Sequence, residues 1–101
     1  MKFAIKNPKE ENIINLIRKI GYYRLPKREK QLSFIKPFNR RGYPRFHLYL
    51  LSQKKNQEII FSIHLDQKKP VYEKAKAHSA EYEGEIVEKE VERIKKILDN
   101  N

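Results

Sequence analysis

The sequence predicts an α+β fold: a three-stranded antiparallel sheet with two helices packed on one face, in the chain order α-β-β-β-α. Two segments, one near each end of the chain, repeat apolar residues at the spacing of a buried helix face. Between them, residues 45–51 and 58–66 are rich in aromatic and β-branched residues and alternate apolar with polar positions, as half-buried strands do. The length of 101 residues fits a single domain spanning residues 1–101.

The first predicted helix covers residues 8–20. Asn7 is a favourable N-cap, Pro8 suits the first helical position, and Glu10 stands where a capping box places its acidic partner. Gly21 provides the stop at the other end. The apolar face of this helix comprises Ile13, Leu16, Ile17 and Ile20.

The second predicted helix covers residues 85–98. Its apolar residues recur at positions that share one face, namely Val87, Val91, Ile94 and Leu98. Glutamates crowd the start of this segment and basic residues fill its end, so the charges complement the helix dipole. Together with the first helix, it would cover one face of the sheet and leave the other toward solvent.

Three strands are predicted between the helices, at residues 31–36, 45–51 and 58–66. Pro37 ends the first of them or places it at a sheet edge, because proline has no N–H for the ladder. The polar residues 52–57 connect the other two strands as a hairpin.

The hairpin register decides which side chains meet. Pairing Leu50 with Ile59 brings six apolar residues onto one face, and a slip by one residue would destroy this match. The same register makes five further pairs: Leu48 with Phe61, Phe46 with Ile63, Tyr49 with Ile60, His47 with Ser62 and Arg45 with His64. The last three pairs occupy the face that is expected to point toward solvent.

Positive charge is concentrated in the first two thirds of the chain. Residues 1–70 carry 17 Lys and Arg against five Asp and Glu, whereas residues 71–101 carry six against eight. Such a field attracts a polyanion, because Lys and Arg displace the condensed counterions of nucleic acids. The alternative is a lysine-rich surface that only keeps the protein in solution. The expected nucleic-acid contacts are Arg18, Lys19, Arg24, Lys27, Arg28, Arg40, Arg41, Tyr43 and Arg45.

The composition excludes several classes of protein. The chain has no cysteine, which rules out disulfides, zinc fingers and thiol catalysis and fits a cytoplasmic location. It has no apolar run long enough for a signal peptide or a membrane helix, so no membrane association is expected. The three glycines do not form a phosphate-binding loop. No cofactor is expected, unless a divalent metal binds at the site considered next.

The histidines are the candidates for chemistry. His47 on the second predicted strand could act as the general base that activates a ribose 2′-hydroxyl. His64 and Asp66 lie two positions apart on one strand and point the same way, and His78 and Glu81 in the following segment could fold back over them. These four residues could hold a divalent metal such as manganese or zinc, or His64 could be an acid–base catalyst beside a carboxylate. The plainer alternatives are a surface histidine, a turn-capping aspartate and a glutamate that complements the helix dipole.

Residues 12–22 (NIINLIRKIGY) and His47 resemble the first helix and the sheet histidine of the small HicA-type toxins. The order helix, three strands, helix is shared by these toxins and by the double-stranded-RNA-binding fold. HicA-type toxins are RNases that use a histidine on the sheet, so the resemblance implies RNA cleavage with His47 as the catalytic residue. Residues 61–70 (FSIHLDQKKP) and 77–79 (AHS) are also similar to small bacterial proteins of unknown function.

Three functional hypotheses follow from these observations. The first is a small nucleic-acid-binding domain, with RNA as the favoured ligand, which grips its partner through residues 18–45 and the open sheet face. The second is a small nuclease that depends on a histidine or on a metal. The third is a protein-interaction module that binds an acidic partner, or a second copy of itself, through a sheet edge.

Overall fold

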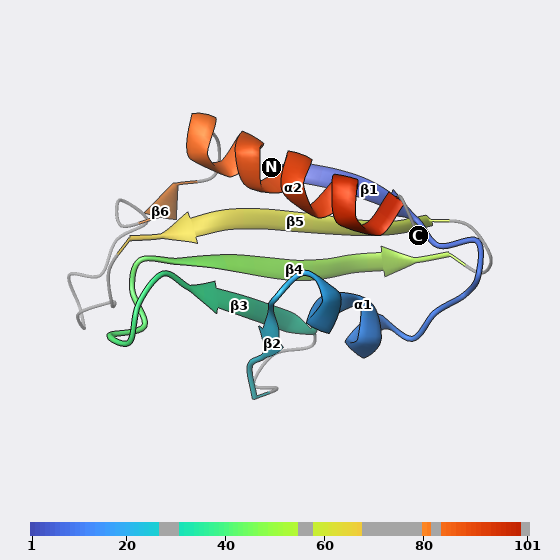
Figure 1. Cartoon of the computed structure of the whole chain (residues 1–101), viewed down its shortest axis with the longest axis horizontal. Coiled ribbons are helices and arrows are strands. Elements are labelled where there is room, and N and C mark those ends of the chain that lie inside the picture. The colour runs from blue at the N-terminus through green and yellow to red at the C-terminus, as the bar shows by residue number, and fades with distance from the viewer. Residues whose placement is uncertain (27–30, 55–57, 68–79, 82–83, 100–101) are drawn as a thin grey trace.

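The computed structural model describes residues 1–26, 31–54, 58–67, 80–81 and 84–99, with only the backbone of 80–81. One antiparallel sheet runs through this part of the chain, and both helices lie on the same face of it (Figure 1). In chain order, the elements are β1 (Lys2–Lys6), α1 (Ile13–Lys19), β2 (Tyr23–Arg24), β3 (Ser33–Pro37), β4 (Arg45–Gln53), β5 (Glu58–Asp66), β6 (Ala80–Glu81) and α2 (Glu85–Asp99). The strands are hydrogen bonded in the order β1-β5-β4-β3-β2, and the short β6 pairs with the end of β5. No helix in the described ranges combines the length and the apolar composition needed to cross a membrane.

The prediction of a three-stranded sheet is wrong, although the α+β class and the antiparallel pairing agree with the structure. The sequence does not predict β1, because the strand buries only Phe3 and Ile5, which is too short an alternation to stand out. β1 pairs with β5 along its whole length, so β5 lies inside the sheet instead of at its edge. β2 is only two residues long and gives no pattern either.

The first helix is shorter than predicted, because α1 begins at Ile13 and not at the proline after Asn7. Its N-cap is Asn12, whose side-chain oxygen accepts a hydrogen bond from a first-turn N–H at 2.8 Å. The buried Asn7 side chain donates to the Glu11 carbonyl and accepts from the Glu11 N–H, both at 3.0 Å. Glu10 has a φ of 50°, in the left-handed region, which a right-handed α-helix does not accommodate. Asn7 therefore closes a turn between β1 and α1 and does not cap the helix.

The register of β4 against β5 differs from the predicted one by two residues. Leu50 pairs with Phe61 and not with Ile59, and His47 consequently lies directly opposite His64. A shift of two leaves every side chain on its predicted face, because side chains alternate with a period of two. The faces were therefore predicted correctly, whereas the pairs across the strands were not.

The register difference arises at the loop end of the hairpin. The pairing jumps between Leu50 and Ser52, as a β-bulge at Leu51 would cause. Beyond the bulge, β4 continues into the segment predicted as loop, and the Lys54 N–H donates to the Glu58 carbonyl at 2.9 Å. The two paired strands are therefore separated by residues 54–57 and not by the whole of residues 52–57.

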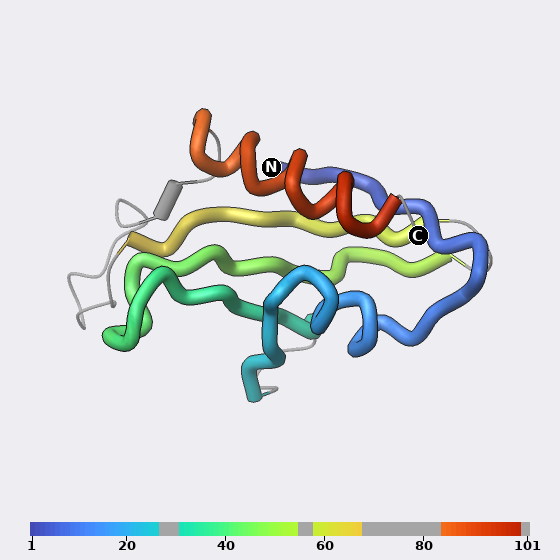
Figure 2. The backbone as a smooth tube through the Cα atoms, viewed as in Figure 1, coloured from blue at the N-terminus to red at the C-terminus, as the bar shows by residue number. Residues whose placement is uncertain are grey.

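The hydrophobic core lies between the sheet and the two helices. α2 buries the predicted apolar face and ends one residue after the predicted boundary. Figure 2 shows α2 lying over β1 and β5, while α1 lies toward β2. The largest fully buried side chains from the strands include Ile5, Phe34, Leu48, Ile59, Phe61 and Ile63.

Candidate functional site

The sheet face opposite the helices carries a cluster of polar and aromatic side chains from β4 and β5. We call it the histidine cluster, and its members are Arg45, His47, Tyr49, His64 and Asp66. Phe46 and Leu48 are buried in the core, so strand alternation sends the side chains between and beside them to the opposite face. The register then places His47 opposite His64 and Arg45 opposite Asp66.

The Asp66 carboxylate is the centre of the histidine cluster. Its Oδ1 lies 2.7 Å from His64 Nε2, and its Oδ2 lies 3.2 Å from His47 Nδ1 and 3.1 Å from Arg45 Nε. Burial by itself raises the pKa of Asp66, but the hydrogen bonds from His47, His64 and Arg45 outweigh burial and hold this pKa well below its usual range. The carboxylate is therefore ionised at neutral pH and accepts hydrogen bonds from all three neighbours.

The hydrogen bond to Asp66 fixes the tautomer of a neutral His47. Because an ionised carboxylate can only accept, the Nδ1 that faces Asp66 carries the proton and Nε2 keeps its lone pair. This Nε2 is buried and has no hydrogen-bond partner. A neutral imidazole held in one tautomer by a carboxylate is suited to act as a base or as a metal ligand.

Aromatic stacking shields the two histidines from solvent. The Tyr49 ring stacks on His47 with ring centroids 4.3 Å apart and lies 5.6 Å from His64, while the two imidazoles are 5.1 Å apart. Each histidine is only 8% exposed. The expectation that the sheet face leaves His47 and His64 toward solvent is therefore wrong, because their own neighbours cover them.

The predicted metal site is only half contained in the described part of the chain. His64 and Asp66 lie together as expected, and one ligand atom from each, with one from His47, come within 4.8 Å of one another. His78 and the side chain of Glu81 lie outside the described residues. Sequence reasoning did not place His47 in this group, because the predicted register set it opposite a serine. The charge match between Arg45 and Asp66 is the signal that would have favoured the observed register.

Those predicted nucleic-acid contacts that the structure describes come from several separate elements. Arg18 and Lys19 lie in the last turn of α1, and Arg24 lies on β2. Arg40 and Arg41 lie in the turn between β3 and β4. Lys27 and Arg28 lie outside the described residues. Arg45 is a member of the histidine cluster, and Tyr43 adjoins the cluster, because the Arg45 guanidinium carbon lies 4.4 Å from the centroid of the Tyr43 ring while its Nε donates to Asp66.

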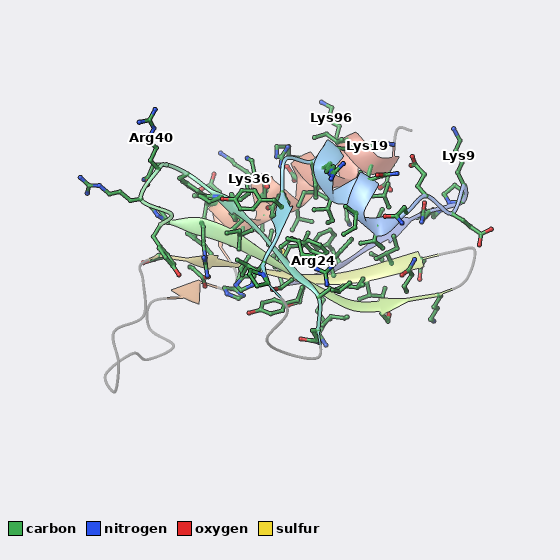
Figure 3. The ribbon with its side chains drawn as sticks, turned by 90° about the horizontal axis from the view of Figure 1, so that it is seen from below. Lys9, Lys19, Arg24, Lys36, Arg40 and Lys96 are labelled. Atoms are coloured by element: carbon green, nitrogen blue, oxygen red, sulfur yellow. The ribbon has the colours of Figure 1, made fainter. Side chains whose placement is uncertain are left out.

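Several basic side chains do share one side of the molecule. Those that project on the side of the helices in Figure 3 are Lys9, Lys19, Lys36, Arg40 and Lys96. They are spread along the long axis of the view. The histidine cluster lies on the other face, so the sheet separates it from this basic side.

A groove of about 470 Å³ lies on the helix side, between α2 and the end of β3. We call it the Phe38 groove, and it is lined by Lys36, Pro37, Phe38, Phe46, Ile86, Lys89, Glu90 and Arg93. Phe38 is 47% exposed and Ile86 is 41% exposed, so two large apolar side chains meet water at this one place. The Phe38 ring rests on the buried Phe46 ring, with centroids 5.0 Å apart, which supports Phe38 from below. Sequence reasoning missed this groove, because it joins residues from two distant segments.

The cations at the Phe38 groove differ in how far they are neutralised. Arg93 donates to the buried Glu90 carboxylate at 2.8 and 2.9 Å and is held by it. Lys89 lies 3.3 Å from Glu85, but both side chains are well exposed, so this pair is weak. Lys36 forms no ion pair with any described residue. Its side chain passes over Gly21, 3.6 Å from where a Cβ would stand.

The turn that follows Phe38 in the chain carries two further cations. The Arg41 N–H donates to the Asn39 side-chain oxygen at 2.9 Å, and the Gly42 N–H donates to the Asn39 carbonyl at 3.1 Å. Gly42 has a φ of 89°, which favours glycine. This hydrogen-bonded turn holds Arg40 and Arg41 exposed at its tip, without an ion pair to any described residue.

Comparisons with protein-family models, with curated proteins and with solved structures found no match.

Proposed function

We propose that the protein is a small nucleic-acid-binding domain of the cytoplasm that takes an unpaired stretch of RNA in the Phe38 groove. The observation that supports this proposal best is an exposed aromatic ring in a groove that is partly lined by basic side chains, of which Lys36 forms no ion pair with a described residue. Phe38 is 47% exposed, Lys36 lines the same groove, and the exposed Arg40 and Arg41 follow Phe38 by two and three residues in the next turn. Stacking on an aromatic ring and neutralisation of phosphates are the two contributions that bind single-stranded nucleic acids.

The shape of the Phe38 groove favours an unpaired base over a duplex. Its volume of about 470 Å³ falls within the range of small-ligand pockets, which suits one base with part of its sugar. A base within a duplex is stacked on both sides and cannot reach Phe38. Ile86 on the opposite wall would contact the edge of the inserted base, while Arg40 and Arg41 at the turn would contact flanking phosphates.

The position of the Phe38 groove favours binding over cleavage. Phe46 lines the groove, whereas its neighbour His47 points to the other face of the sheet. A nucleotide in the groove would therefore be separated from the histidine cluster by the sheet itself. The nuclease hypothesis from the HicA-type resemblance needs a substrate on the other face, where the Arg45 side chain beside His47 is already paired with Asp66.

The test is binding of a short fluorescein-labelled oligouridylate, followed by fluorescence anisotropy at low salt. Phe38→Ala should weaken binding about 5- to 150-fold, because base stacking on an aromatic side chain contributes about 1–3 kcal/mol. Tyr23→Ala is the matched control, since Tyr23 is also an exposed aromatic residue (57%) but lies on β2, away from the groove. Absence of binding, or an equal loss in both variants, contradicts the proposal. The same oligonucleotide as DNA measures the preference for RNA.

A further inference from the structure

We propose that His47, His64 and Asp66 form a binding site for a divalent transition-metal ion. This function is separate from RNA binding in the Phe38 groove, because the two sites lie on opposite faces of the sheet. Each of the three residues offers one ligand atom, and these atoms lie within 4.8 Å of one another. Ligand atoms around a tetrahedral zinc ion are about 3.4 Å apart, given zinc–ligand distances of about 2.1 Å. Asp66 is already closer than this to His64 Nε2, at 2.7 Å, and to His47 Nδ1, at 3.2 Å, so an ion would replace hydrogen bonds within the cluster and would require only small movements of the side chains.

The strand pairing holds the three ligands in place before any ion arrives. His47 and His64 are directly opposed on β4 and β5, and Asp66 follows two positions later on the same face as His64. Both strands are interior to the sheet and are hydrogen bonded on each side. A site built on such strands loses little conformational freedom when a ligand binds.

The chemistry of the ligands points to a transition metal and not to magnesium or calcium. Two imidazoles and one carboxylate suit zinc, iron, cobalt or nickel, whereas magnesium and calcium prefer oxygen ligands. Both histidines are 8% exposed, and magnesium gives up its water molecules reluctantly. A carboxylate and two nitrogen donors in a buried setting thus select an ion of intermediate softness.

Arg45 and Tyr49 contact the three ligand residues and hold their orientation, as the neighbours of metal ligands do in metal proteins. Arg45 Nε donates to Asp66 Oδ2 at 3.1 Å and orients the carboxylate, so that Oδ1, which accepts from His64 Nε2 at 2.7 Å, is the oxygen that would bind an ion in place of that hydrogen bond. The Tyr49 ring packs on both imidazoles and limits their rotation. These contacts orient the ligands without occupying all of their donor atoms.

One buried nitrogen of the cluster has no partner. Among the described residues, His47 Nε2 is the one buried side-chain nitrogen or oxygen without a hydrogen bond. Leaving such an atom unsatisfied is unfavourable, and native proteins rarely tolerate it without a functional reason. Coordination of an ion through Nε2 would give this nitrogen the partner that the hydrogen-bond network does not provide. The competing explanation, a purely internal Arg–Asp–His network, predicts no affinity for metals.

The experiment is isothermal titration calorimetry of the full chain, freed of metal by a chelator, with zinc chloride. We expect one ion per chain in a saturable isotherm. His64→Gln and His47→Gln should weaken binding more than about 100-fold, since removal of even second-layer contacts costs about 10- to 100-fold. Asp66→Asn should do the same, whereas Asp99→Asn, which removes the same charge from the exposed end of α2, should leave affinity unchanged. Phe38→Ala should also bind zinc normally, so that failure of RNA binding and failure of metal binding are told apart.

A second measurement needs no variant and so does not depend on whether the variants fold. In the wild-type protein, zinc should shift the ring-nitrogen resonances of His47 and His64 in nuclear magnetic resonance spectra, and cobalt should develop the visible absorption of a nitrogen- and oxygen-coordinated ion. The proposal is overturned if the wild-type protein shows no saturable binding of zinc or cobalt. It is also overturned if His47→Gln binds as tightly as the wild type, or if Asp99→Asn loses as much affinity as Asp66→Asn.

Discussion

The Tyr22 hydroxyl donates a 2.6 Å hydrogen bond to the Glu90 carboxylate, which lies on the buried face of α2. Tyr22 is 2% exposed and Glu90 is 5% exposed, so a negative charge lies within the core. Arg93 also binds this carboxylate, and the same guanidinium donates to the Ile20 carbonyl at 2.7 Å. The end of α1 and the middle of α2 are therefore joined by a buried polar network in a core that is otherwise apolar.

Tyr22→Phe should lower the free energy of unfolding by about 1–3 kcal/mol, because the Glu90 carboxylate loses a donor and stays buried. Urea denaturation followed by circular dichroism measures this change. Tyr23→Phe is the control, since Tyr23 is 57% exposed and its variant should unfold like the wild type. If the two variants unfold alike, the hydrogen bond between Tyr22 and Glu90 does not stabilise the fold.

The same contact predicts how stability depends on alkaline pH. Burial is the main cause that raises the pKa of Tyr22 far above its ordinary value of 10.0, and the Glu90 charge adds to it. The unfolded chain loses this proton near pH 10, whereas the folded chain keeps it. The stabilisation is therefore complete below pH 10 and is lost as pH rises further, by up to about 1.4 kcal/mol per pH unit. Urea midpoints at increasing pH should fall more steeply for the wild type than for Tyr22→Phe, and parallel curves would contradict this assignment.

The periodic spacing of apolar residues in the sequence predicts those helices and strands that bury several residues on one face. Helix 85–98 and strand 58–66 were predicted nearly as the structure has them, because each carries four buried positions at one spacing. β1 was missed, because two buried residues make no measurable period. The inner and outer faces of β4 and β5 were correct despite the shifted register, since a shift of two residues does not change the face.

The candidate sites were less predictable, because both depend on contacts between distant segments. His64 and Asp66 could be grouped from their i, i+2 spacing on one strand. His47 joins them only in the observed register, which depends on an irregularity at Leu51 that no turn residue marks. The Phe38 groove depends on α2 packing beside the end of β3, and nothing local to either segment indicates it.

Arg40→Gln combined with Arg41→Gln should reduce the salt dependence of RNA binding. Each phosphate contact on a single strand contributes about 0.7 to the slope of log affinity against log salt, so loss of two contacts should lower the slope by about 1.4. Anisotropy titrations between about 50 and 200 mM potassium chloride measure this slope. Lys54→Gln, in the hairpin at the end of β4, is the charge control and should leave the slope as it is. An unchanged slope in the double variant would remove the turn from the proposed RNA contact.

Labelled RNA that is bound by the protein should remain intact during incubation, with or without manganese. The reason is geometric, because the Phe38 groove and His47 lie on opposite faces of the sheet, and Tyr49 covers the His47 ring. Gel electrophoresis of end-labelled RNA measures cleavage, and His47→Ala serves as the comparison. If the wild-type protein cuts the RNA and His47→Ala does not, RNA reaches the histidine cluster after all. In that case the activity implied by the HicA-type resemblance would replace the binding role proposed for the groove.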